Sequence, residues 1–333
     1  MQSIIYFQRK VSFLAIFNAF SAKSPFIRLL LIITFFLAAS LLPFVGLIFL
    51  AALPLVVFLL GMINDPMKTL IALLSALCIT AIILSLMHDV LPVVTLAAMG
   101  LAGVLMTRAA VKNYSINAII LVPSLAIGAA IAFYFIYGAI QLSISPWQLV
   151  GKHIAEAVDM NIKLYGRLPL DPGEIKSLKE SKPEIVQLFT GIFPAVCVIA
   201  ALFTIWINLL IGNRVLRKAG IAAAALSRMS EWKAPGWLVW FFLAGAGLCF
   251  IPQTYARSIG INLLLMASFV YLLQGLAIVS FFFQSRNISM FFRWLTYFLI
   301  AIQQILMIAI AAVGFFDIWI DFRKYFRKDQ ATN

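Results

Sequence analysis

The chain has 333 residues, of which 64% are hydrophobic and 11% are charged. A soluble domain is about half apolar and about a quarter charged, so a chain of this length could not hide so much apolar surface from water. The composition therefore excludes a soluble enzyme and indicates an integral membrane protein, because a bilayer is the solvent that accepts apolar side chains. The formal net charge is +13, but the basic residues lie between apolar runs and form no stripe beside aromatic residues, so no nucleic-acid partner is predicted.

Nine long apolar segments follow one another along the chain, and each is a candidate membrane span. Backbone polar groups in lipid must be satisfied internally, and these runs are continuous rather than alternating, so we predict an all-α, polytopic helical membrane protein. The segments are Phe26–Leu41, Phe44–Gly61, Met67–Met87, Leu91–Met106, Ser115–Gln141, Glu184–Ile211, Gly236–Ile251, Asn262–Phe283 and Met290–Ile318. The seventh is short and contains two glycines, so eight or nine full crossings are expected.

The loops between these segments suggest five parts. They are an N-terminal interfacial segment (1–25), a six-helix bundle (26–213) with a polar insert (142–183), a basic loop (214–235), C-terminal helices (236–320) and a basic tail (321–333). The positive-inside rule predicts that the N-terminus and the basic loop are cytoplasmic and that the polar insert lies outside. The rule leaves the side of the C-terminus open, because that side depends on whether the seventh segment crosses fully.

Several helix starts have a recognisable chemistry. A capping residue precedes a proline at Ser24-Pro25, Asp65-Pro66 and Ser145-Pro146. Such pairs favour a helix N-terminus, because the side-chain oxygen accepts a bond from a free first-turn N–H and proline has a helical φ. The third pair precedes an amphipathic helix, Trp147–Tyr165, which is expected to lie at the membrane interface or to cover the bundle.

The charged face of this amphipathic helix is expected to carry two ion pairs. Lys152 and Glu156 are four residues apart, which is the spacing of a helical ion pair. Asp159 and Lys163 repeat that spacing one turn later. The opposite side is apolar, so the predicted helix has one face for solvent and one for protein or lipid.

The sequence carries little that indicates catalysis or energy conversion. We find no Asp, Glu, Lys or Arg near the middle of any predicted span, so a proton relay or a voltage sensor is not expected. No P-loop is present, so active transport would need energy from another protein. No cofactor, metal or catalytic residue is predicted, and the chain is not expected to be an enzyme.

Uncharged polar residues in the last two segments are the candidate ligand-binding residues. They are Asn262, Tyr271, Gln274, Gln303 and Gln304. Amides in lipid usually face other helices or a cavity, so these residues either join helices or line a pocket for a neutral small molecule. The last two segments are expected to pack as an antiparallel hairpin, with Gln274 and Gln303 or Gln304 facing protein. Tyr271 and Gln274 then share one side and are the first choice for a pocket.

The two histidines allow a weaker alternative. His88 and His153 both fall on the predicted outer side, where they could form a metal site or a catalytic base with a carboxylate. The competing interpretation is that both are solvated surface residues, and we expect their replacement by alanine to leave function intact.

Short motifs along the chain resemble a known family. They are Ala52-Leu53-Pro54-Leu55, Pro235-Gly236-Trp237, Gly260-Ile261-Asn262-Leu263, Gln274-Gly275-Leu276-Ala277 and Asp317-Ile318-Trp319-Ile320-Asp321-Phe322-Arg323. They resemble the YybS-like family of bacterial multi-pass membrane proteins, whose first six helices are similar to the substrate-binding S components of energy-coupling-factor transporters. The first span here lacks the small-xxx-small spacing with which S components commonly contact their transmembrane partner.

The resemblance implies a small-molecule binding or transport subunit in the bacterial cytoplasmic (inner) membrane, without its own ATPase and with a separate energising module as partner. The alternative is a scaffold or assembly factor that contacts a membrane protein partner through the polar insert.

Overall fold

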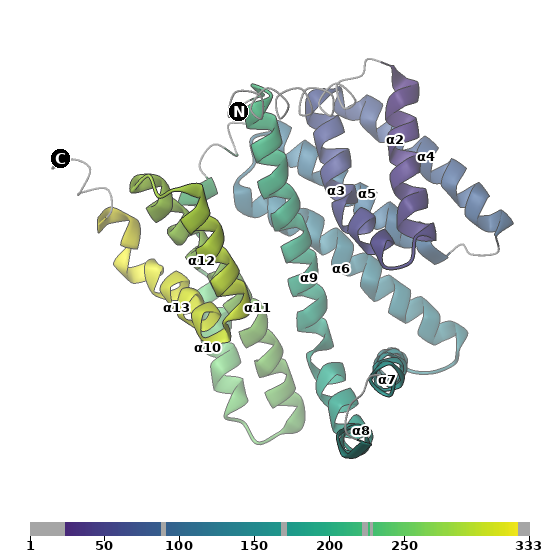
Figure 1. Ribbon diagram of the computed structural model, residues 1–333, viewed down its shortest axis with the longest axis vertical. Helices are drawn as coiled ribbons and strands as arrows, with labels where there is room; N and C mark the ends of the chain where they lie inside the picture. The colour runs from purple at the N-terminus through teal and green to yellow at the C-terminus, as the bar shows by residue number, and fades with distance from the viewer. Residues whose placement is uncertain (1–23, 88–90, 168–171, 222–225, 227–228, 326–333) are drawn as a thin grey trace. The chain divides into compact units, whose positions relative to one another are not determined.

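The computed structural model describes residues 24–87, 91–167, 172–221, 226 and 229–325 (Figure 1). Within these ranges every regular element is a helix and no strand occurs, which confirms the all-α prediction. The helices are α2 (Pro25–Leu41), α3 (Val45–Ile63), α4 (Pro66–Leu86), α5 (Leu91–Val111), α6 (Ile116–Gln141), α7 (Pro146–Tyr165), α8 (Pro172–Glu180), α9 (Lys182–Lys218), the 3₁₀ turn η2 (Met229–Glu231), α10 (Leu238–Cys249), α11 (Thr254–Ser285), α12 (Met290–Ile302) and α13 (Gln304–Ile320).

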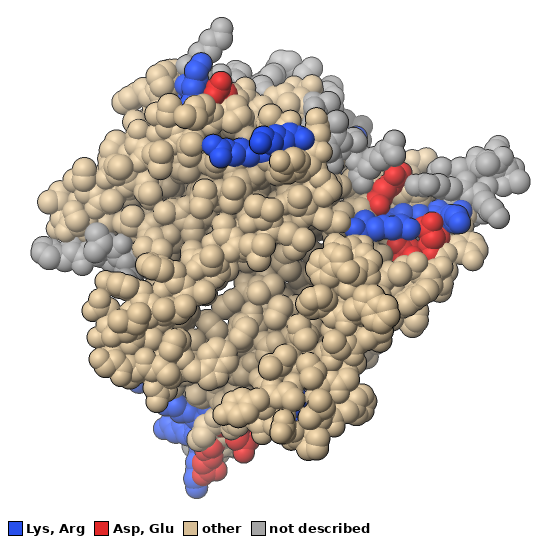
Figure 2. Space-filling view, turned by 180° about the vertical axis from the view of Figure 1, so that it is seen from behind, with Lys and Arg blue, Asp and Glu red and all other residues tan. Residues whose placement is uncertain are grey.

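The apolar segments predicted from sequence all coincide with helices, and the chain is a multi-pass membrane protein. Among the described residues, six helices are long and apolar enough to cross a membrane, or seven if α12 and α13 form one span. The helices α2 and α10 are shorter, with 17 and 12 residues. On the face drawn in Figure 2, charged side chains lie in a few small groups and uncharged residues form most of the visible surface.

The last apolar segment differs from the prediction. Instead of one continuous helix it contains a break at Gln303, where α12 ends and α13 begins after a bend of 104°. Continuous apolar sequence could not indicate this break, because hydropathy measures solvent preference and not helix direction.

The predicted helix starts are found in the structure. Pro25, Pro66 and Pro146 each occupy the first helical position. Asp65 accepts hydrogen bonds from two first-turn N–H groups of α4. Ser145 forms a full capping box with Gln148 at the start of α7. These local signals act within one turn, so they hold whatever the helix packs against.

The chain forms two compact units, which we describe separately. Unit 1 comprises residues 1–131 and 200–227, and unit 2 comprises residues 132–199 and 228–333. The five-part division suggested by the loops stays a prediction.

In unit 1, α2, α3, α4 and α5 pack around a core of large aliphatic and aromatic side chains. The fully buried members include Ile32, Phe36, Leu53 and Leu60. Small residues of α5 allow close packing on α3: Ala102 is fully buried, and a Cβ at Gly103 would lie 2.7 Å from the carbonyl oxygen of Pro54.

In unit 2, α11 packs against both α10 and α13 (Figure 1). Glycines bring the backbones together at both contacts. A Cβ on Gly260 would lie 2.8 Å from the carbonyl oxygen of Gly245 in α10, and a Cβ on Gly275 would collide with the carbonyl oxygen of Ile310 in α13. On the α13 side, Gly314 faces the Tyr271 carbonyl in the same way. Helices in lipid gain little from the hydrophobic effect when they associate, because lipid tails are as apolar as the helix surfaces. Close backbone approach of this kind therefore stabilises the contact through van der Waals packing.

The amphipathic helix α7 is also part of unit 2. Its Val150 and Ile162 are buried, whereas Lys152 and Glu156 are exposed, as the two-sided pattern predicted. The predicted pairing within the helix is wrong, however. Both carboxylate oxygens of Asp159 lie 2.7 Å from the Nζ of Lys182, at the start of α9. This ion pair connects α7 to α9, a long-range contact that spacing along one helix cannot indicate.

Candidate functional site

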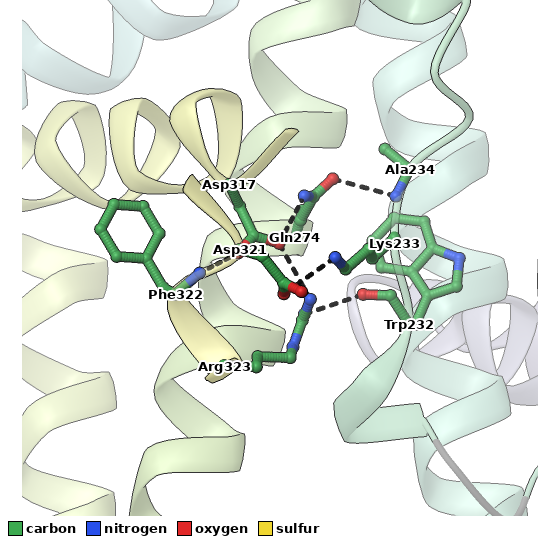
Figure 3. A network of polar contacts seen from close by, with 8 residues as sticks. All are labelled: Trp232, Lys233, Ala234, Gln274, Asp317, Asp321, Phe322 and Arg323. Atoms are coloured by element: carbon green, nitrogen blue, oxygen red, sulfur yellow. Dashed lines mark hydrogen bonds and ion pairs between the residues drawn. The ribbon is translucent and has the colours of Figure 1, made fainter. Parts of the chain in front are cut away.

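A buried polar network lies where α13 ends, inside unit 2. Its centre is Asp317, whose side chain is 0% exposed. Gln274 of α11 and Arg323, which follows α13, reach the same carboxylate and are also buried. Figure 3 shows these side chains pointing toward one another, with the segment 232–234 beside them at the right of the view. We call this group of residues the Asp317 network.

Every oxygen of the Asp317 carboxylate has a donor. Its Oδ2 accepts a hydrogen bond from Gln274 Nε2 at 3.0 Å and one from Arg323 Nη1 at 2.9 Å. Its Oδ1 accepts a bond from the backbone N–H of Phe322 at 2.9 Å. A buried carboxylate is tolerated only when it is paired and hydrogen-bonded in this way, because each ion loses its hydration on burial.

The network also holds the segment that precedes α10. The backbone N–H of Ala234 donates to Gln274 Oε1 at 2.9 Å, and Arg323 Nη2 donates to the carbonyl of Trp232 at 2.9 Å. Gln274 thus contacts this segment with its oxygen and α13 with its nitrogen. Three parts of the chain that are distant in sequence are joined at one buried point (Figure 3).

A partly exposed ion pair lies beside the buried one. Lys233 Nζ donates to Asp321 Oδ1 at 2.9 Å. This hydrogen bond and the lysine charge hold the pKa of the Asp321 carboxyl below its usual value. Asp321 also has a left-handed backbone with φ 47°. That conformation ends α13 and turns the chain back, so that Arg323 returns to Asp317.

The predicted ligand-binding residues Tyr271 and Gln274 are brought together on the side of α11 that faces α13. The amide of Gln274 bonds protein through both its oxygen and its nitrogen, which confirms that it faces protein. Tyr271 packs edge-on against the rings of Phe242 and Phe315. Its buried hydroxyl has no hydrogen-bond partner among the described residues.

Asn262 lies elsewhere and bonds the backbone of α9. Its Oδ1 accepts from the backbone N–H of Ala195 at 2.8 Å, and its Nδ2 donates to the carbonyl of Gly191 at 2.7 Å. In a regular helix these two groups would bond each other, and Pro194 lies inside α9 directly before Ala195. The amide of Asn262 therefore joins α11 to a donor and an acceptor of α9 beside this proline.

Gln303 and Gln304 do not join this group. Both side chains are exposed, so the expectation that one of them faces protein is wrong for the described chain. They lie at the break between α12 and α13, where Gln303 gives no side-chain cap to the first turn of α13. The break thus presents two amide side chains together with backbone groups at two helix ends.

Of the two histidines that were considered for a metal or catalytic site, the structure describes His153. His88 lies outside the described residues. His153 Nδ1 is 3.4 Å from Glu156 Oε2, and the ring lies near Tyr134 and Phe135. Among the described residues, no group of three or more His, Cys, Asp or Glu side chains is placed to hold a metal ion.

Sequence reasoning missed the central residues, Asp317 and Arg323. In the sequence, Asp317 belongs to a closing motif at the end of an apolar segment, and Arg323 belongs to that motif and to the basic tail, so neither was predicted to be buried. One signal was available: an acid within an apolar run is expensive and needs a partner, and an arginine follows six residues later.

Comparison with known proteins places the chain in one family. Neither a curated protein nor a solved structure matches it. The profile of a family described as "Predicted membrane protein (DUF2232)" matches residues 30–318, which include all nine apolar segments apart from the first residues of the first. The chain with its Asp317 network and broken last span is a member of this predicted membrane protein family.

Proposed function

We propose that this protein is a small-molecule binding or transport subunit of a membrane complex, without catalytic activity and without its own ATPase. The observation that supports it is the break at Gln303 within the last apolar segment. Interrupted spans are a recurring way to build solute sites in transporters, because their free helix ends offer backbone donors and acceptors at membrane depth.

The physical argument concerns the backbone groups at the two helix ends that meet at the break. Gln303 N–H bonds the carbonyl of Leu299, and the Gln303 carbonyl bonds the N–H of Met307, so these two bonds flank the break. Between them, one helix ends and another begins without a side-chain cap. Irregular backbone at membrane depth is tolerated only where protein covers it or water reaches it, so a cavity or a bound solute at this point would satisfy it.

The chemistry at the break favours a neutral polar solute. Gln303 and Gln304 each supply one acceptor oxygen and an NH₂ donor, and neither carries charge. The Asp317 network would then act as an anchor that holds α13 on α11 while the region near the break rearranges. Gln274 and Asp317 have protein partners for the atoms described above, so we assign them to this structural role and not to direct solute contact.

The cellular setting forms part of the same proposal. The short motifs that resemble the YybS-like family, and the likeness of that family to transporter S components, support a bacterial inner-membrane protein with a cytoplasmic N-terminus. They also support a separate energising module as partner, since no P-loop occurs in the sequence.

Native mass spectrometry of the full-length protein in a mild detergent tests the proposal. We expect a stoichiometric small molecule on the wild type and at least about fivefold lower occupancy in Gln303→Leu and Gln304→Leu, since each loses a hydrogen-bonding amide. Gln141→Leu is the matched control, because Gln141 is also an exposed amide at a helix end but is remote in sequence from the break.

Two outcomes contradict the proposal. One is a wild type with no bound molecule but a stable protein partner, which would favour the scaffold or assembly factor that contacts its partner through α7 and α8. The other is equal loss in all three variants, which would show that occupancy does not depend on the break.

A further inference from the structure

A pocket in unit 1 lies between the first turns of α2 and α4. Its volume is about 570 Å³. Arg28 and Lys68 supply two positive charges, Ser75 supplies a hydroxyl, and Phe26, Leu29 and Ile71 are among the apolar lining residues. Because the beginnings of both helices line one pocket, their N-terminal ends lie at the same end of the unit.

Arg28 is an unusual residue for such a place. It is only 6% exposed, and its Nε has no hydrogen-bond partner among the described residues. Within that part of the chain neither Arg28 nor Lys68 forms an ion pair with a carboxylate. A buried guanidinium normally has anionic or carbonyl partners, because its donors lose their hydration on burial. The residues that line the pocket therefore include two cations and no acid.

The two helix ends at the pocket differ in how their first turns are capped. Asp65 caps α4, where its Oδ1 accepts from the N–H groups of Met67 at 2.7 Å and Lys68 at 3.2 Å. The N-terminal residue of α2, Ser24, provides no such side-chain bond. The first-turn N–H groups of α2 thus have no side-chain cap, and a helix N-terminus of this kind attracts an anion.

We propose that this pocket binds a phosphate group, carried either by an anionic phospholipid headgroup or by a free phosphate. The two cations and the first turn of α2 would hold the phosphate oxygens, since guanidinium and ammonium groups both bind phosphate strongly. The apolar lining suits the glycerol and upper acyl chain of a lipid, and basic pockets between membrane helices bind such headgroups. This site is separate from the break at Gln303 and does not depend on the function proposed above.

Native mass spectrometry with added ligand tests the site on full-length protein in detergent. The probes are phosphatidylglycerol, phosphatidylcholine as a lipid without net charge, and inorganic phosphate. We expect phosphatidylglycerol to bind more tightly than phosphatidylcholine. Its affinity should fall about fivefold in Lys68→Gln, since one basic residue near an anionic surface contributes about that factor. It should fall about tenfold or more in Arg28→Gln, which removes buried charge-assisted bonds.

The control variant is Lys112→Gln, which removes an exposed basic residue of unit 1 that does not line the pocket. Lys68 is exposed as well, so its replacement should not disturb folding. Lys68→Gln therefore tests the site even if Arg28→Gln fails to fold. Competition by inorganic phosphate would identify free phosphate as the ligand, and binding of phosphatidylglycerol that phosphate does not displace would identify the lipid. Unchanged affinity in Lys68→Gln, or an equal loss in Lys112→Gln, would overturn the proposal.

Discussion

The Asp317 network allows a sharp test of what holds α13 in place. Asp317→Leu removes a carboxylate that accepts bonds from Gln274, Phe322 and Arg323. It leaves the guanidinium of Arg323 buried without its counter-ion. Removing one partner of a buried ion pair typically costs about 3–5 kcal/mol, because the remaining charge keeps its desolvation penalty. Arg323→Met leaves Asp317 in the same situation, so a similar loss is expected.

The double variant distinguishes the pair from its surroundings. Asp317→Leu with Arg323→Met removes both charges, so neither unpaired-ion penalty remains. It still deprives Gln274 Nε2, the Phe322 N–H and the Trp232 carbonyl of partners. Lost neutral hydrogen bonds of this kind cost about 1 kcal/mol each, so we expect a total loss of about 1–3 kcal/mol. The double variant should therefore be more stable than either single variant.

Unfolding by sodium dodecyl sulfate in mixed micelles, followed by tryptophan fluorescence, measures these differences. Trp232 is buried beside Arg323 and reports on the network directly. The control is Lys233→Met, which removes the neighbouring, partly exposed ion pair with Asp321 and should cost about 0–1 kcal/mol. If the two single losses simply add in the double variant, the charges are not coupled and the reasoning is refuted.

Three further predictions concern other contacts of unit 2. Gly275→Ala should lower stability by at least about 1–3 kcal/mol, since its Cβ would collide with the Ile310 carbonyl; the same unfolding assay checks this, and a neutral effect would contradict it. Asn262→Leu should cost about 1–3 kcal/mol, because the Ala195 N–H and the Gly191 carbonyl lose their bonds to the amide; hydrogen exchange in α9 should become faster, and slower exchange would contradict this. Because Lys233 lowers the pKa of Asp321, the stability difference between wild type and Asp321→Asn should be constant from about pH 5 to 8 and shrink as the pH falls below the ordinary aspartate pKa, about 4, and through the lowered pKa of the folded state; a difference that stays constant in acid would show another cause.

The local elements of this protein follow from its sequence. Asp65 and Ser145 with their prolines place two helix starts, and the amphipathic pattern of residues 147–165 places α7. Each of these features depends on atoms within one or two turns, so the surrounding fold cannot easily alter them. The apolar segments are equally secure, because about 20 apolar residues in a row have one stable form in lipid.

The tertiary structure alone decided how those helices meet and where their polar groups go. Lipid tails are as apolar as the helix surfaces, so a hydrophobic pattern does not tell which side of a span faces protein. Hence Gln274 could be expected to face protein, but its link to Asp317, the exposure of Gln303 and the unpaired Nε of Arg28 among the described residues could not. Each of these depends on contacts between helices that are far apart in sequence, and such contacts exist only once the helices have packed.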